Sequence, residues 1–162
     1  MHTFKKLWPL WLVFVGIIAS TIAIALFTQR YDADFLMRMF MASFFIVFGL
    51  FKVINLKGFV TAYRMYDILA QKIKPYAYAY PFLEIGLGVL FIWYMWPLAI
   101  LGITILLSGM SAYGVWKKLQ KKEEVPCACL GALFYVPMTY VTLVENLLMV
   151  IMALAMIIMI YV

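Results

Sequence analysis

The chain has 162 residues, of which 68% are hydrophobic and only 12% are charged. A soluble domain carries about half apolar and about a quarter charged residues, so this chain lacks the polar residues to cover a soluble core. Its aromatic content of 18% excludes a disordered chain. The net charge of +6 does not indicate nucleic-acid binding, because no polar surface is available to carry a basic face. The composition predicts a single polytopic membrane domain.

Five runs of the chain are long and apolar enough to cross a bilayer, for which a helix needs about 20 residues. Helices are the expected form, because an open sheet leaves backbone polar groups unsatisfied in lipid. The predicted spans cover about residues 8–27, 35–56, 76–96, 97–116 and 141–162. The first run follows Lys5 and Lys6 and resembles a signal peptide, but it is longer than a cleaved signal core. We therefore predict a retained signal anchor.

The distribution of Lys and Arg predicts the orientation of these spans. If the N-terminus is cytoplasmic, 11 of the 13 basic residues face the cytoplasm. They are Lys5, Lys6, Lys52, Lys57, Arg64, Lys72, Lys74, Lys117, Lys118, Lys121 and Lys122. Only Arg30 and Arg38 lie outside. The positive-inside rule then predicts a cytoplasmic N-terminus and an outer C-terminus in the cell (inner) membrane.

Two segments are neither spans nor simple loops. Aromatic and apolar residues recur at helical spacing over residues 59–74, opposite a polar stripe that includes Arg64 and Asp67. This pattern predicts one amphipathic helix that lies flat at the cytoplasmic interface. Residues 117–140 form a connecting loop in which a basic run precedes two glutamates and a Cys-x-Cys sequence.

Cys127 and Cys129 are the only cysteines in the sequence and lie one residue apart. A thiolate is the reactive form, which neighbouring lysines favour and which Glu123 and Glu124 oppose. A disulfide across one residue would close a small, strained and easily reduced ring. Two thiolates could instead bind Cu(I) or share Zn(II). A redox pair, a soft-metal site and inert thiols all remain open.

Two charged residues are predicted to lie inside the membrane. Glu84 falls well within the third span, and an intramembrane carboxylate indicates a functional site by default. A helix that began at Pro81 would be too short to span, so we expect a span that kinks at Pro81 and buries Glu84. Lys52 lies at a comparable depth, and a Lys52–Glu84 ion pair would lower the cost of both charges. The pair could be structural or could take part in proton or redox chemistry.

Two patterns in the last span have structural interpretations. Thr142 and Glu145 follow the spacing of a capping box, with Thr142 at the cap, while Asn146 could hydrogen-bond across the bundle. Met152 and Met156 belong to a methionine stripe, and thioethers bind Cu(I). The same stripe is typical of helix packing, which is the favoured interpretation.

Residues 35–146 resemble a known family. The sequence PFLEIGLG at residues 81–88, together with Arg38 and Lys52 upstream, resembles the DoxX-like membrane superfamily. The sequence CACLG at residues 127–131, just before the last span, is similar to the MauE branch, the methylamine-utilisation membrane proteins. The resemblance implies a four-helix core with an added N-terminal span.

The resemblance also implies a role in the maturation of a periplasmic amine dehydrogenase, alongside a thioredoxin-like partner. Cys127 and Cys129 are then the candidate redox pair. The charge count places this pair at the cytoplasmic face, whereas periplasmic disulfide chemistry would need it outside.

Three functions follow as hypotheses. In the first, Cys127 and Cys129 exchange dithiol and disulfide with a thioredoxin- or glutaredoxin-like protein, above a polar pocket shaped by Glu84 and Lys52. A quinone is one candidate electron acceptor, and whether the chain is an enzyme stays open. The second is a Cu(I) or soft-metal carrier, whose ligands would be Cys127, Cys129, Met152 and Met156. The third is a non-catalytic assembly subunit with inert thiols.

Overall fold

The computed structural model describes residues 2–121 and 139–161, with side chains for all of these except residues 2–7, 9 and 139–141. All regular structure within these ranges is helical. Five helices are long and apolar enough to cross a membrane: α1 (His2–Thr28), α2 (Ala33–Ile54), α5 (Lys74–Trp93), α6 (Pro97–Gln120) and α7 (Thr139–Tyr161). The predicted all-helical fold with five candidate spans is therefore confirmed.

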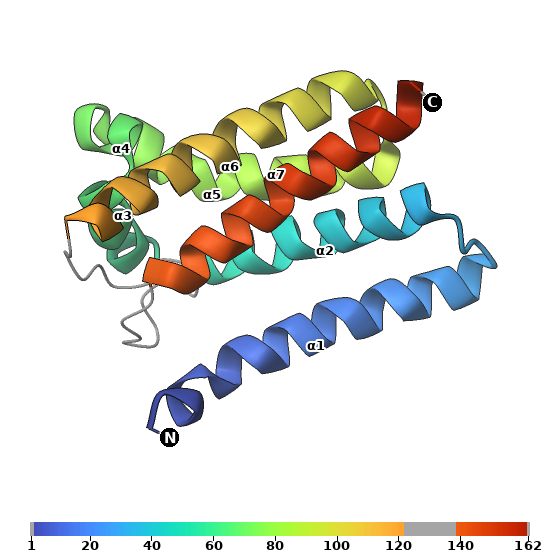
Figure 1. Ribbon diagram of the computed structural model, residues 1–162, viewed down its shortest axis with the longest axis horizontal. Helices are drawn as coiled ribbons and strands as arrows, with labels where there is room; N and C mark the ends of the chain where they lie inside the picture. Colours follow the sequence, from blue (N-terminus) through green and yellow to red (C-terminus); the bar gives the residue numbers. More distant parts are fainter. Residues whose placement is uncertain (1, 122–138, 162) are drawn as a thin grey trace.

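The helices α2, α5, α6 and α7 form a bundle, and α1 lies beside it. α2 packs on α5, α6 packs on α7, and α7 also contacts α2. Among the described helices α1 contacts α2 alone, and it lies along the outer side of α2 in Figure 1. Successive spans run in opposite directions. The start of α1, the end of α2 and the end of α6 therefore share one end of the molecule (Figure 1).

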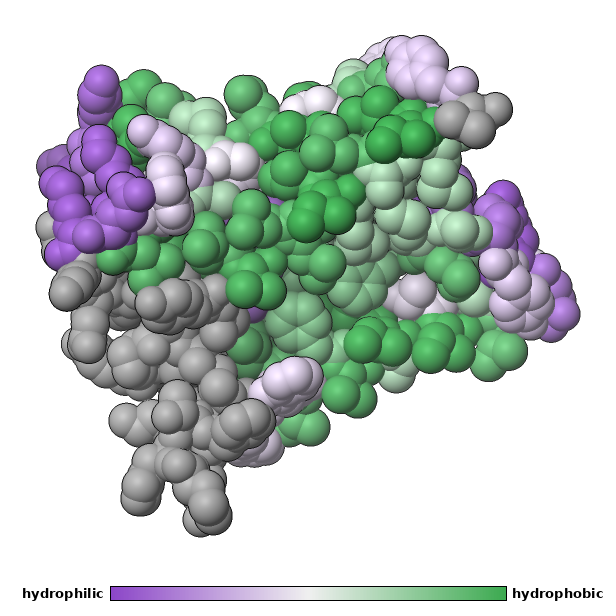
Figure 2. All heavy atoms as spheres, viewed as in Figure 1, coloured by the Kyte–Doolittle hydropathy of each residue, from purple (hydrophilic) through white to green (hydrophobic). Residues whose placement is uncertain are grey.

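That end also holds two short helices, α3 (Leu56–Tyr66) and α4 (Ile68–Lys72), and we call it the basic end. Its described basic surface residues are Lys57, Arg64, Lys72, Lys74, Lys117, Lys118 and Lys121. Figure 2 shows hydrophilic residues gathered at the two ends of the molecule, with a broad hydrophobic band between them. Such a band is the surface that a lipid-facing helix bundle presents.

The region predicted as one interfacial helix over residues 59–74 is divided at Asp67. The backbone of Asp67 is extended, with ψ 128°, and ends α3. Its carboxylate accepts the backbone N–H groups of Leu69 and Ala70 and so caps α4. Asp67 is completely buried, although the sequence assigns it to a polar stripe. The buried carboxylate is stabilised because it accepts hydrogen bonds from the free N–H groups at the start of α4.

Close packing between α2 and α5 depends on two glycines. A Cβ atom at Gly49 would lie 3.2 Å from a backbone oxygen of α5, and one at Gly88 would lie 2.9 Å from a backbone oxygen of α2. Small residues at a crossing let helix backbones approach each other in membranes. Lys52 lies about one turn after Gly49, and Glu84 lies about one turn before Gly88. The crossing therefore brings these two charged residues together.

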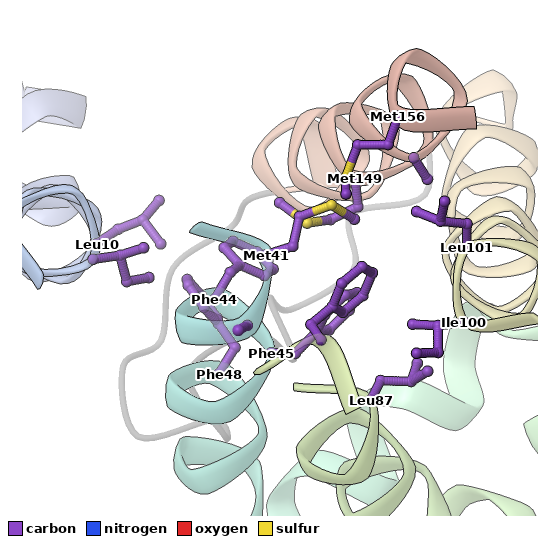
Figure 3. Close-up of a cluster of buried hydrophobic side chains, with 14 residues drawn as sticks. Leu10, Met41, Phe44, Phe45, Phe48, Leu87, Ile100, Leu101, Met149 and Met156 are labelled. Atoms are coloured by element: carbon purple, nitrogen blue, oxygen red, sulfur yellow. The ribbon is translucent and has the colours of Figure 1, made fainter. Parts of the chain in front are cut away.

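The interior beyond this crossing is an apolar core. It includes Met41, Phe44, Phe45, Phe48, Leu87, Phe91, Leu101, Met149 and Met156. Figure 3 shows Met149 and Met156 of α7 projecting toward Met41 of α2, with Phe45 between α2 and the helices that carry Leu87 and Ile100. Phe45 stacks on Phe91 with ring centroids 6.0 Å apart.

Polar contacts also join α2 and α5 at the opposite end of the bundle. The hydroxyl of Tyr94 donates to Asp34 Oδ1 at 3.1 Å, and the guanidinium of Arg38 lies 4.5 Å from the centre of the Tyr94 ring. Burial raises the pKa of Tyr94 to about 12, and the charge of Asp34 adds to this rise. Tyr94 therefore remains a hydrogen-bond donor at physiological pH.

Candidate functional site

The centre of the site is a buried ion pair between Lys52 of α2 and Glu84 of α5. Lys52 Nζ lies 2.5 Å from both Oε1 and Oε2 of Glu84. The two residues are only 8% and 5% exposed, respectively. The helix α5 runs through Pro81, and Glu84 is buried as expected. An isolated buried charge here would destabilise the protein, so each residue of the pair offsets the cost of burying the other.

Aromatic rings surround the ammonium group of this ion pair. Lys52 Nζ lies 5.5 Å from the ring centre of Phe59 and 5.2 Å from that of Tyr80. The ring of Tyr63 lies 5.0 Å from Phe59 and 4.5 Å from Tyr80. The faces of such rings attract cations, and more strongly where water is excluded. The short helix α3 thus supplies a wall of the site rather than only an interfacial anchor.

A hydrogen bond connects this aromatic wall to the start of α4. The hydroxyl of Tyr63 donates to Asp67 Oδ2 at 2.9 Å. Burial raises the pKa of the Tyr63 phenol well above its ordinary value of 10.0, with smaller contributions from Tyr80 and Asp67. Tyr63 therefore stays protonated and keeps donating to Asp67. This contact holds the break between α3 and α4 against the bundle.

The other side of the site comes from α6 and α7. A cavity of about 20 Å³ lies among the ion pair, the aromatic rings and these two helices, which is room for about one water molecule. We call it the polar pocket, and its described non-aromatic polar lining residues are Lys52, Glu84, Ser108, Ser111, Thr142, Glu145 and Asn146. These residues include two carboxylates, Glu84 and Glu145, and one ammonium group.

The predicted capping box at Thr142 is wrong. The helix α7 begins at Thr139, so Thr142 is already helical, and Glu145 is 5% exposed and lines the polar pocket. Asn146 Nδ2 donates to the carbonyl oxygen of Thr142 at 2.7 Å, within α7 rather than across the bundle. A sequence signal existed, because Thr142, Glu145, Asn146 and Met149 recur at the spacing of one helix face. Ser108, with Ser111 three residues later, shows the same pattern.

The cysteine pair lies outside the described residues. The segment that carries Cys127 and Cys129 connects Lys121, after the end of α6, to Thr139, at the start of α7. Both attachment points lie at the basic end (Figure 1). The polar pocket is at this same end, and both flanking helices contribute residues to it.

The methionines proposed as copper ligands lie in or beside the apolar core. Met156 is completely buried there, and Met152 packs against the core from its edge. Among the described residues, no three His, Cys, Asp or Glu side chains are grouped to hold a metal ion. The surroundings of Met156 are those of a packing residue.

The fold and the site together define a multi-pass helical membrane protein with a buried ion pair near one membrane surface. The family described as methylamine utilisation protein MauE matches residues 30–159. The chain belongs to this family, whose description links it to methylamine utilisation. The match begins after α1 and extends from α2 into the last turn of α7. No curated protein and no solved structure matches the chain.

Proposed function

We propose that this protein exchanges dithiol and disulfide through Cys127 and Cys129 with a thioredoxin- or glutaredoxin-like partner. The exchange would support the maturation or the redox state of another protein. The observation that carries the proposal is the position of the polar pocket. Thr142 and Glu145 line it from the first two turns of α7, next to the attachment point at Thr139, and Ser111 lines it from α6, the other helix that flanks the cysteine segment.

The exchange proceeds through a mixed disulfide. A thiolate of one protein attacks a disulfide sulfur of the other, which releases one thiolate, and a second thiolate of the attacking protein then resolves the intermediate. Each complete exchange moves two electrons and two protons between the cysteine pair and the partner. A quinone, taking up two electrons and two protons, is the candidate acceptor that would return the pair to its disulfide form.

The polar pocket supplies groups that can hold a proton. A thiol must lose its proton before it attacks, so a nearby acceptor assists the exchange. Glu84 and Glu145 place two carboxylates in a pocket with room for about one water molecule. In the proposal Glu84 holds the proton, and Lys52 positions Glu84 through contacts to both of its oxygens.

Orientation is part of the proposal, with the basic end cytoplasmic and the C-terminus outside. The gathering of basic residues at one end of the bundle supports it. A reporter that is active only outside the cytoplasm should work when fused after Val162 and fail when fused after Lys122. The reverse pattern would contradict the orientation and would place the cysteine pair among periplasmic partners.

The cysteine pair is tested by single and double substitution. Cys127→Ser and Cys129→Ser should each abolish exchange, and one of them should accumulate a mixed disulfide with the partner, seen as a reducible band on a non-reducing gel. Neither substitution should change stability much, because so small a ring removes little entropy from the unfolded chain. A fully functional double Cys→Ser protein would contradict the proposal and favour a non-catalytic assembly subunit.

Labelling with a membrane-impermeant thiol reagent from each side of intact membranes gives an independent measurement. Reaction from the cytoplasmic side alone is expected, and only after reduction if the resting state is a disulfide.

Loss of Cu(I) binding in both cysteine variants without any mixed disulfide would instead favour the soft-metal carrier.

A further inference from the structure

A second and much larger cavity, of about 370 Å³, lies between α4 and the last turns of α6. The described residues that line it are Tyr66, Ile68, Gln71, Lys72, Gly114, Lys117, Lys118 and Lys121. We call it the basic pocket, since four of these residues are lysines and none is a carboxylate. The proposed exchange reaction uses none of these lysines.

The two walls of the basic pocket belong to different helices, α4 and α6, and α6 makes a close backbone approach to the end of α3, just before α4. A Cβ atom at Gly114 of α6 would lie 2.3 Å from the carbonyl oxygen of Tyr66, at the end of α3. This approach sets the separation of α6 from the α3–α4 junction. Lys72 therefore faces the pocket from α4, while Lys117 and Lys121 face it from α6.

Among the described residues, no carboxylate forms an ion pair with Lys72, Lys117 or Lys121. Asp67 follows Tyr66 directly, but it is completely buried and its oxygens accept the Tyr63 hydroxyl and two backbone N–H groups. Glu123 and Glu124 lie outside the described residues. Lysines are favoured at helix C-termini and on cytoplasmic surfaces. Neither preference explains a cavity of this size between two lysine-bearing helices.

The position of the basic pocket indicates where its ligand resides. Lys117 and Lys118 lie in the last turn of α6, whose candidate span ends at Gln120. This is the depth at which the hydrocarbon core gives way to lipid headgroups. Lysine acts as a point charge toward phosphate, and basic pockets between membrane helices bind phosphate-bearing headgroups.

We propose that the basic pocket binds a phosphate group, supplied by the headgroup of an anionic phospholipid. Free phosphate has the same binding chemistry, so the test must separate the two sources. The inference does not depend on the exchange reaction, because the binding assay needs neither cysteine.

The test measures lipid binding to the full-length protein in detergent micelles by native mass spectrometry, with phosphatidylglycerol and phosphatidylcholine titrated separately. The variant Lys72→Gln/Lys117→Gln removes one exposed lysine from each wall. The matched control Lys57→Gln/Lys74→Gln removes two exposed lysines from the same end of the protein, outside the pocket. Both variants lose the same charge, so nonspecific attraction falls equally.

The wild-type protein should bind phosphatidylglycerol in preference to phosphatidylcholine. The pocket variant should lose about fivefold in affinity for each lysine removed, and the control variant should stay within about twofold of wild type. Equal losses in the two variants, or equal binding of the two lipids, would overturn the proposal. Displacement of phosphatidylglycerol by millimolar sodium phosphate would support a phosphate-binding pocket. It would overturn the lipid headgroup as the source and assign the pocket to a soluble anion.

Discussion

The same pair of helices, α2 and α5, builds two different interiors. Toward the basic end it holds the charges of Lys52 and Glu84, and away from that end it holds an apolar core, in which Phe45, at the edge of the polar pocket, stacks on Phe91. Lipid solvates apolar side chains about as well as the apolar core does, so the core gains mainly from close packing. The ion pair depends on one specific partner, because either charge alone would be stranded. The polar pocket should therefore tolerate substitution less well than the apolar core.

The largest effect is expected from removing one charge of the pair. Glu84→Leu leaves Lys52 buried without its carboxylate and should cost about 3–5 kcal/mol, measured as unfolding in mixed micelles with increasing SDS. The double variant Lys52→Met/Glu84→Leu should recover most of this loss, because no charge remains unpaired. A Glu84→Leu protein as stable as wild type would remove the distinction between the two interiors.

The same variants separate structure from function. Glu84→Gln also removes the charge but keeps the shape of the side chain and an oxygen that can accept from Lys52, so it should lose less stability than Glu84→Leu and stay in the membrane while impairing exchange. If the double variant folds but does not exchange, the pair has a role beyond stability. If the double variant is fully active, the pair is structural and Glu84 has no part in the proposed proton step.

Overpacking the helix crossing that separates the two interiors should have the next largest effect. Gly88→Ala adds a methyl group 2.9 Å from a backbone oxygen of α2 and should destabilise the protein by about 1–3 kcal/mol. Gly86→Ala is the matched control, because a Cβ atom there meets nothing within 4 Å. Its stability should be unchanged or slightly higher. An equal change in stability for Gly88→Ala and Gly86→Ala would contradict a specific requirement for close helix approach at Gly88.

A smaller effect is expected at the aromatic wall of the polar pocket. Tyr63→Phe removes the hydrogen bond to Asp67 and should cost about 1.5 kcal/mol at neutral pH. Burial raises the pKa of Tyr63 above its ordinary value of 10.0, so the stabilisation by protonated Tyr63 is complete below pH 10 and declines above it. The stability difference between wild type and Tyr63→Phe should therefore be constant from pH 7 to 9 and shrink above pH 10.0. A difference that grows at alkaline pH would contradict the assigned donor.

The smallest effect is expected in the apolar core. Met156→Leu conserves volume in a completely buried position and should change stability by less than about 1.5 kcal/mol, with exchange activity retained. Cu(I) binding, measured with a competing chelator, should also be unchanged if Met156 only packs. Loss of Cu(I) binding together with activity would reopen the soft-metal hypothesis for this region.

Much of the fold was predictable because it follows from chain-local physics. The lengths of the apolar runs indicated five candidate spans, and the two charges inside them indicated the ion pair, since neither is tolerable alone. The errors came where one residue type serves two local roles. The pattern over residues 59–74 puts Asp67 in a polar stripe, whereas Asp67 caps α4 from a buried position. The spacing of Thr142 and Glu145 predicts a capping box, whereas Glu145 lines the polar pocket.

The sequence by itself determined the class of protein. Long apolar runs require a membrane, and buried charges require partners, however the helices are arranged. Tertiary structure decided which helix faces meet. Only the packing of α6 and α7 against the α2–α5 crossing makes Ser111 and Glu145 line the same pocket as Lys52. Only the approach of Gly114 to the end of α3 brings Lys72 opposite Lys117. Such contacts depend on residues distant in the chain, and a periodic pattern along one helix does not specify its partner.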